Sequence, residues 1–245
     1  MKTLLGVTID NDLKQKVLEK IFKYWDNPKG FFHVVSLNPE NIVIAQNDLT
    51  YKTILNDSKI RLNDGIGIVI ASRWLGIDMI DRLTGVDLMK ELVEMAGKRR
   101  FHVLLIGGGA KLAESLAKCY QQKYSKSKFV GIEGTKNILS MHEKENEKIF
   151  SIVADLKPNL ILVAFGSPFQ EKWLWQNRDK FRGCVCMGVG QGFDVEGSRV
   201  KRAPMWIQKI GMEWLYRLLT QPWRWRRQLR LVKFIYLVMK QKIFG

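Results

Sequence analysis

The chain is poor in the residues that build disulfide frameworks and zinc sites, with three cysteines and three histidines among 245 residues. Cys184 and Cys186 alternate within an apolar run, which favours a buried strand in a reducing compartment over a paired disulfide framework. His33 and His102 lie in strand-like runs, and no Ser/His/Asp order typical of a hydrolase is evident. These scarcities argue against secreted scaffolds, zinc modules and serine hydrolases.

Long apolar runs are also missing. None approaches the ~20 residues that a membrane-spanning helix needs. The N-terminus carries one lysine and soon turns polar, so we expect no signal peptide. Because 46% of the residues are hydrophobic, the chain can still form a large core, and its length suits one α/β domain with or without an appendage. We expect a cytoplasmic protein that does not span the membrane.

Acidic residues are scarce toward the C-terminus. The formal net charge is +16, and residues 199–245 hold 12 Lys/Arg against one acid, Glu213. The preceding 198 residues hold 28 Lys/Arg against 23 acids, so most of the excess lies in the tail. Such a tail attracts phosphates of nucleic acid, of anionic lipid or of a substrate. No helix-turn-helix, RRM or KH pattern supports nucleic acid, although a nucleic-acid-binding protein remains an alternative.

Apolar runs alternate with helical patterns along the first 198 residues. Helical spacing is clear at Leu13, Val17, Ile21 and Trp25, and Asn38-Pro39-Glu40 is a strong helix start. Further helices are expected after Asp64, over 86–98, from about 110 to 124, near 142–157 and over 169–180. This alternation predicts an α/β fold with a mainly parallel sheet and helices on both faces. The expected strands are Thr3–Ile9, Phe31–Leu37, Lys59–Leu62, Phe101–Ile106, Phe129–Ile132, Asn159–Ala164 and Cys184–Val189.

The stretch from Leu62 to Gly85 contains the main candidate for a catalytic carboxylate. Asp64 stands between a strand-like run and an apolar helical run, and glycines at 65 and 67 let another molecule approach the backbone. In open α/β sheets, ligands bind at such carboxyl ends of strands. Aspartate before an apolar run also commonly caps the helix, so the residues alone leave both roles open.

A glycine-rich turn is the clearest candidate for binding phosphate. Gly107, Gly108 and Gly109 follow a strand and precede a helix, whose N-terminal N–H groups suit a diphosphate. Glu133 follows the next strand and could accept a hydrogen bond from a ribose hydroxyl. Leu112 replaces the third glycine of GxGxxG, which counts against an NAD-dependent oxidoreductase. A tight turn without a ligand is the alternative.

Two more turns can be interpreted either as ligand-binding sites or as purely structural features. Gly166 leaves a buried strand, and Gln170 falls in the first turn of the next helix, where it could bond a base or a sugar or simply be polar. Asp10-Asn11-Asp12 resembles the DxD that holds a divalent ion in many nucleotide-sugar enzymes, but these residues also start a helix well. We favour the helix start and expect neither a metal nor another cofactor.

Three long motifs in order resemble the WecG/TagA/CpsF glycosyltransferase family. They are NDGIGIVIASRWLG…DRLTGVDL, VAFGSPFQEKW and GQGFDVEGSRVKRAPMWIQKIGMEWLYRLLTQPWRWRRQ, within a match from about Leu37 to Arg230. The resemblance implies a Rossmann-like fold and a metal-independent, inverting transferase. Such an enzyme moves a hexosamine-type sugar, here ManNAc above all, from UDP to an undecaprenyl-diphosphate-linked GlcNAc at the cytoplasmic membrane face. ManNAc-uronate and glucose are the alternative donors.

The resemblance also assigns residues. Asp64 matches the proposed base, and Ser36 falls where many members have threonine. Gln191 stands where glycine or alanine is common, and GIEGTKN after the strand at 129–132 lacks the usual aromatic ending. Arginines of the tail match positions that meet the acceptor diphosphate. With the glycine turn and its ribose candidate, the expected substrate-binding residues are Asn38, Arg82, Gly107, Gly108, Gly109, Glu133, Gly166, Gln170, Gln191, Arg217, Arg224 and Arg227.

The tail, residues 199–245, is expected to be a basic helical appendage to a core of residues 1–198. Its tryptophans and arginines interleave, which suits an anionic membrane surface, where each basic residue adds roughly 1 kcal/mol of attraction. A helix packed on the core with a solvated basic face is the alternative. We expect the core to fold alone and removal of 231–245 to weaken only membrane binding. The sequence leaves a homo-oligomer possible.

Overall fold

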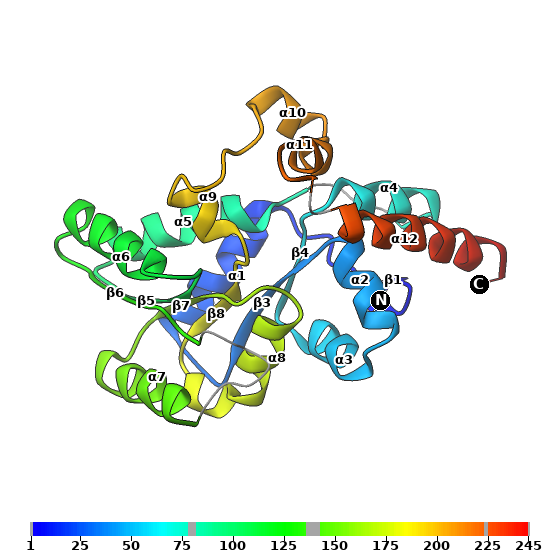
Figure 1. Ribbon diagram of the computed structural model, residues 1–245. Coiled ribbons are helices and arrows are strands. Elements are labelled where there is room, and N and C mark those ends of the chain that lie inside the picture. Colours follow the sequence, from blue (N-terminus) through cyan, green and yellow to red (C-terminus); the bar gives the residue numbers. More distant parts are fainter. Residues whose placement is uncertain (1, 78–81, 136–142, 223–224, 245) are drawn as a thin grey trace.

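A computed structural model describes residues 2–77, 82–135, 143–222 and 225–244, except for the side chains of residues 226 and 227. A six-stranded sheet runs through its centre in the order β4-β3-β8-β7-β5-β6 (Figure 1). Every neighbouring pair in it is parallel. The strands are β3 (Phe32–Leu37), β4 (Ile60–Asn63), β5 (His102–Gly107), β6 (Lys128–Ile132), β7 (Leu160–Ala164) and β8 (Val185–Gly188).

Helices cover both faces of this sheet, as predicted, because the strands are apolar on both sides. Along β3, Val34 packs into the cluster formed with the helices at 14–26, 85–98 and 112–123, whereas Val35 packs on the opposite face with the helices at 39–46, 49–57 and 66–74. The helices of the core are α1 (Lys14–Asp26), α2 (Pro39–Gln46), α3 (Leu49–Asp57), α4 (Ile66–Trp74), α5 (Gly85–Lys98), α6 (Leu112–Lys123), α7 (Glu143–Leu156), α8 (Phe169–Gln176), the 3₁₀ turn η2 (Arg178–Phe181) and α9 (Gly192–Glu196).

The N-terminal run is not a strand of the main sheet, contrary to the prediction. Thr3–Ile9 contains a small antiparallel hairpin, β1 (Thr3–Leu4) and β2 (Val7–Thr8). Leu5 and Gly6 both have positive φ, at 53° and 73°, which is the backbone of a tight type I′ turn. The apolar Leu4 and Val7 are buried against the helical layer instead.

Two helices separate β3 from β4 where the pattern indicates one helix start. Asn38 caps α2 as predicted, its Oδ1 accepting from the Asn41 N–H at 2.9 Å. Asp48 then caps a second helix, α3, by accepting from the Tyr51 N–H at 3.0 Å. The first helix therefore ends at the Asn47 C-cap, and Asp48 begins the second.

The tail forms α10 (Met205–Lys209), α11 (Glu213–Thr220) and α12 (Trp225–Phe244). Helix α12 lies across α2, and its Phe234 and Val238 are buried in the core at 2% and 3% exposure (Figure 1). Gln241 Oε1 also accepts a hydrogen bond from the Leu5 N–H, and Arg230 pairs with Glu40. This packing argues against the expectation that removing 231–245 would affect only membrane binding. The boundary at residue 198 stays a prediction.

Among the described helices, none has an apolar stretch of the length that crossing a membrane requires. The exposed large apolar side chains instead concentrate on α4 and on the three tail helices.

Candidate active site

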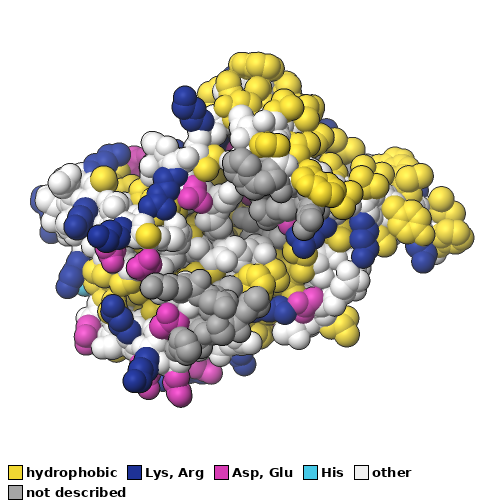
Figure 2. Space-filling model, viewed as in Figure 1, with side chains coloured by type: hydrophobic (Ala, Val, Ile, Leu, Met, Phe, Trp, Pro, Cys, Tyr) yellow, Lys and Arg dark blue, Asp and Glu magenta, His cyan; other side chains and the backbone are white. Residues whose placement is uncertain are grey.

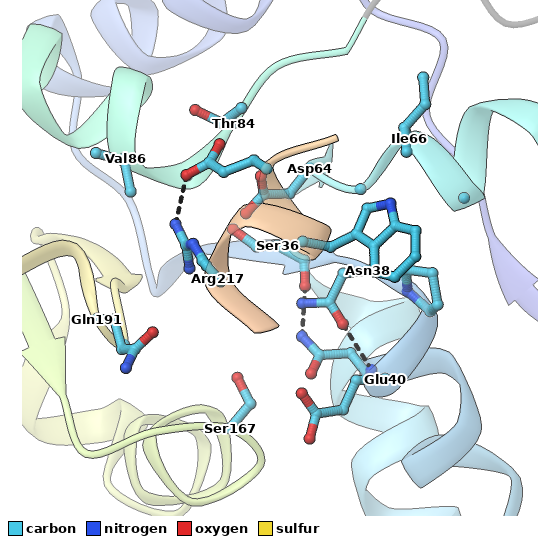
Figure 3. Close-up of a pocket in the computed structure, with 18 of the residues that line it drawn as sticks. Ser36, Asn38, Glu40, Asp64, Ile66, Thr84, Val86, Ser167, Gln191 and Arg217 are labelled. Carbon is cyan, nitrogen blue, oxygen red and sulfur yellow. Dashed lines mark hydrogen bonds and ion pairs between the residues drawn. The ribbon is translucent and has the colours of Figure 1, made fainter. Parts of the chain in front are cut away.

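A cavity of about 760 Å³ opens at the carboxyl ends of the sheet strands. Its walls come from the turns after β3, β4, β7 and β8, from α4, and from the tail helices α11 and α12. Most of the predicted site residues meet there although they are far apart in sequence (Figure 3). Those lining it are Ser36, Asn38, Asp64, Arg82, Gly108, Gly166, Gln170, Gln191 and Arg217.

Asp64 does not cap the helix that follows it. Gly65 occupies the N-cap of α4 and no side-chain hydrogen bond caps that helix. The Asp64 carboxylate instead accepts a hydrogen bond from the backbone of Gly85, the first residue of α5. A Cβ on Gly85 would lie 2.7 Å from Ser36 Oγ and 3.5 Å from Asp64 Oδ2, so only glycine lets α5 begin this close to both side chains. The carboxylate is thereby available to the cavity.

The electrostatic environment of Asp64 raises the pKa of its carboxyl above the ordinary value. Burial is the main cause, and the negative charge of Glu213 adds to it. The Gly85 hydrogen bond and the positive charges of Arg217 and Arg82 act in the opposite direction. A carboxylate of raised pKa is a stronger base than an exposed aspartate, as proton abstraction requires.

Two arginines of the tail line the cavity together with Asp64. Arg217 Nη2 donates to Glu213 Oε1 at 2.6 Å within α11 (Figure 3). Arg202, which the sequence analysis did not select, also lines the cavity, and its Nε lies 3.7 Å from the same Glu213 oxygen. Its two terminal nitrogens bind the Asp87 carboxylate of α5 at 2.5 and 2.9 Å. The Arg202–Asp87 ion pair joins the tail to the N-terminal end of α5, which begins beside the Asp64 carboxylate.

Arg82 contributes to the same junction. Its Nη2 donates to the carbonyl oxygen of Gln208 in α10 at 2.9 Å. The segment that leads into α5 is thus tied to the tail at a second point. Arg224 lies outside the described residues, as does the side chain of Arg227, so their predicted contact with a diphosphate stays a prediction.

Gln170 lines the cavity, but its carboxamide is largely used within the protein. The side chain is 3% exposed, and its Oε1 accepts from the N–H groups of Gly166 and Gly190, both at 3.1 Å. Its Nε2 donates to Glu171 Oε1 at 2.7 Å. Gln170 therefore clamps the turns after β7 and β8 together, and neither interpretation of its sequence position anticipated this role.

Glu171 helps to hold the Gln170 side chain in position. It is 1% exposed, and burial raises the pKa of its carboxyl, against the effect of hydrogen bonds from Gln170 and Ser167. Ser167 Oγ donates to Glu171 Oε1 at 2.9 Å. A buried carboxyl held by two side chains of one turn fixes the shape of that turn.

The glycine-rich turn faces a smaller cavity of about 220 Å³ that shares Gly108, Ala164 and Phe165 with the large one. Gly107, Gly108 and Gly109 line it together with Glu133 and Thr135. All three glycines have positive φ, between 81° and 92°. The predicted phosphate turn and the predicted ribose acceptor therefore meet at one small cavity adjoining the cavity of Asp64.

The acidic run near the N-terminus has other uses. Arg61 Nε and Nη2 both donate to Asp10 Oδ1, at 3.1 and 2.8 Å, and Asp12 pairs with Lys16 and Lys20. Neither aspartate lines the large cavity. Among the described residues, no group of three His, Cys, Asp or Glu is placed to hold a metal ion.

Some site residues escaped the sequence analysis although a signal was present. Glu213 is the single acid of the tail, and Arg202 lies inside the third family-like motif. Asp194 and Thr84 also line the cavity, and burial raises the pKa of Asp194. Their positions depend on contacts between segments about a hundred residues apart, which local patterns do not reveal.

Comparison with known proteins extends over the whole chain. The chain is 29% identical over 241 residues to an N-acetylglucosaminyldiphosphoundecaprenol N-acetyl-beta-D-mannosaminyltransferase of Bacillus subtilis (strain 168). The alignment covers 98% of this chain and 92% of that protein. Proteins of the same name from Bacillus spizizenii and Staphylococcus aureus (strain NCTC 8325 / PS 47) are 32% and 30% identical. These alignments cover 96% and 98% of this chain, and 88% and 92% of the relatives. The profile described as "Glycosyl transferase WecG/TagA/CpsF family" matches residues 2–245, and the chain belongs to this family of glycosyltransferases.

Proposed function

We propose that the protein transfers N-acetylmannosamine from UDP to the GlcNAc of an undecaprenyl-diphosphate-linked acceptor, with inversion and without a metal ion. The acceptor and the sugar follow the names of the relatives, which are about 30% identical along nearly their whole length. The observation that carries the proposal is the cavity itself, where a carboxylate of raised pKa and tail guanidinium groups meet at the carboxyl ends of the strands. Family membership favours this function over the oxidoreductase and nucleic-acid alternatives.

Asp64 acts as the general base in this proposal. Its carboxylate takes the proton of the acceptor hydroxyl while that oxygen forms a bond to the anomeric carbon of the donor. The bond from the anomeric carbon to the UDP oxygen breaks, and UDP leaves on the opposite face with the electron pair. Attack from the opposite face converts an α-configured UDP-sugar into the β linkage that the relatives' names specify. Ser36 lies beside Asp64, where its hydroxyl can bond the substrate.

The departing UDP requires positive charge, which this chain can supply with side chains and backbone N–H groups. The nucleoside would lie in the smaller cavity, with its ribose at Glu133 and its phosphates toward the glycine turn. Arg217 and Arg202 on the tail side of the large cavity would bind the acceptor diphosphate. Arg224 and Arg227 would join them.

The tail would also attach the protein to the cytoplasmic face of the membrane. Figure 2 shows apolar side chains gathered over α10, α11 and α12. Trp206, Leu219 and Phe244 are 65%, 74% and 80% exposed on these helices. Apolar side chains on a basic helical segment suit the headgroup layer of an anionic bilayer. The enzyme would then meet a lipid-linked acceptor where that acceptor resides.

A UDP-release assay across donors tests the proposal. The panel contains UDP-ManNAc, UDP-ManNAc-uronate, UDP-glucose and UDP-GlcNAc, with a lipid-diphosphate-linked GlcNAc as acceptor. We expect acceptor-dependent UDP release with UDP-ManNAc at least tenfold faster than with the others. Faster release with glucose or the uronate would keep the reaction and change the donor, whereas no acceptor-dependent release with any of them would contradict the proposal.

A further inference from the structure

The large cavity has an apolar half that the sugar-transfer chemistry does not use. It lies between α4 and α12, whose facing residues recur at helical spacing along each helix. On α4 these are Gly67, Ile70, Ala71 and Trp74, and on α12 they are Gln228, Leu231, Phe234, Ile235 and Val238. Two helical stripes thus face each other across a groove that opens from the Asp64 end of the cavity.

Part of this groove is closed by contact between helices, and part of it is open to solvent. A Cβ on Gly67 would lie 2.7 Å from Pro39 Cγ and 3.9 Å from Phe234 Cε1, so α2, α4 and α12 meet at that glycine. On the same two helices, α4 and α12, Ile70 and Ile235 are 62% and 51% exposed. Because large apolar side chains of both helices are exposed along the groove, they provide a surface for an apolar ligand.

The groove is continuous with a charged pocket. The same cavity is lined both by Arg217, Arg202 and Asp64 and by the apolar side chains of α4 and α12. An amphiphile with an anionic head and a hydrocarbon chain matches both halves at once. We propose that this groove holds the first isoprene units of the polyprenyl acceptor, whose diphosphate lies at Arg217. The inference rests on the proposed function for the identity of the acceptor.

The bilayer has a different surface available to it. Leu229, Val232 and Tyr236 of α12 are 58%, 66% and 64% exposed and do not line the cavity. Helix α12 therefore carries one apolar stripe that lines the cavity and another that is exposed to solvent. The outward stripe suits a membrane, and the inward stripe suits a chain that leaves the active site.

The length of the prenyl chain provides the test. Farnesyl diphosphate and dimethylallyl diphosphate are titrated into the full-length protein by calorimetry, below micelle-forming concentrations and without detergent or lipid. We expect farnesyl diphosphate to bind on the order of tenfold more tightly, because burying each further CH₂ is favourable. Ile70→Ser and Ile235→Ser should bring the affinity ratio close to one. Val232→Ser, a matched change on the outward stripe, should keep the wild-type ratio.

Each other outcome has a defined meaning. Equal affinities in the wild type, or an equal loss in Val232→Ser, would overturn the groove. A change in sedimentation in Ile235→Ser, with an unchanged ratio, would assign this face to a second copy of the chain. Liposome flotation that depends on Ile235 and not on Val232 would assign it to the bilayer. If no acceptor is glycosylated but the chain-length preference is present, the proposed function fails and the groove remains.

Discussion

The two sides of the active site are held in different ways. Asp64 and Ser36 come from the ends of neighbouring parallel strands and are fixed by the sheet and by the close approach of Gly85. Arg217 and Arg202 come from the tail, where a few ion pairs and one hydrogen bond from Arg82 position them. We infer that the sheet side sets the chemistry, whereas the tail side binds the acceptor and responds to its environment.

The largest expected effect belongs to the sheet side. Asp64→Asn should lower kcat by a factor on the order of 10² or more while UDP binding persists, as expected for loss of a general base. Since the folded-state pKa of Asp64 is raised, its contribution to stability decreases as pH rises through that pKa. The variant should therefore melt no lower than wild type at neutral pH, as measured by calorimetry. A variant with near-full activity would exclude Asp64 as the base.

Loss of a tail cation should act mainly through the acceptor. Arg217→Ala should raise KM for the lipid-diphosphate acceptor by about tenfold, since charge-assisted hydrogen bonds to phosphate are worth roughly 1.5–3 kcal/mol. KM for the UDP-sugar should change much less. Lys242→Ala, which removes a tail charge outside the cavity, is the control. A loss of kcat as large as that of Asp64→Asn would remove the proposed division between the two sides.

The packing of α12 predicts a stability effect. Phe234→Ala should lower the free energy of unfolding by about 3–5 kcal/mol, as is usual for a buried phenylalanine. Tyr236→Ala, two residues away on the solvent-facing side, should change it by less than about 0.5 kcal/mol. Urea denaturation of both variants without lipid measures the difference. Equal losses in the free energy of unfolding of the two variants would indicate that α12 does not pack on the core.

The pH dependence connects the two sides. Because a base works as its carboxylate, kcat/KM should decrease as pH falls through the pKa of Asp64, at a pH above the ordinary value of 3.8. Glu213 raises this pKa, so Glu213→Gln should move the acidic limb to lower pH. Arg217→Ala should move it to higher pH. If neither variant shifts the acidic limb of the pH profile, the charges of Glu213 and Arg217 do not affect the pKa of Asp64.

The smallest effect is expected at the N-terminal acidic run. Asp12→Ala should leave the transfer rate within about twofold of wild type, because Asp12 pairs with lysines away from the cavity. Transfer should also persist in EDTA. Activity that disappears with EDTA and returns with Mn²⁺ would instead assign a metal to the reaction.

What the sequence predicts well here is local. The period of apolar residues identified the six strands of the main sheet, and the Asp64 turn, the glycine turn and the Asn38 cap depend on residues within a few positions of one another. The hairpin at Leu5 and Gly6 escaped because a short apolar run does not show where it turns back.

Pairings between distant segments were beyond local patterns. Gln170 clamps Gly190, Arg202 binds Asp87, and Phe234 packs beside Gly67. Each depends on how the sheet order brings strand ends together, and the alternation of strands and helices does not specify that order. The resemblance to a family placed Arg217 and Arg82 in the pocket, but their partners Glu213 and Gln208 required the structure.

Glu213 has a consequence for which anions the site admits. As the single acid of the tail, it pairs with Arg217 and lies near Arg202. An arriving anion must therefore replace a carboxylate that is tethered one helical turn away. Chloride or a single carboxylate gains little by that exchange, whereas a diphosphate can satisfy both guanidinium groups together. We therefore expect Glu213 to disfavour weakly bound anions and to leave Arg217 and Arg202 accessible to a multiply charged ligand.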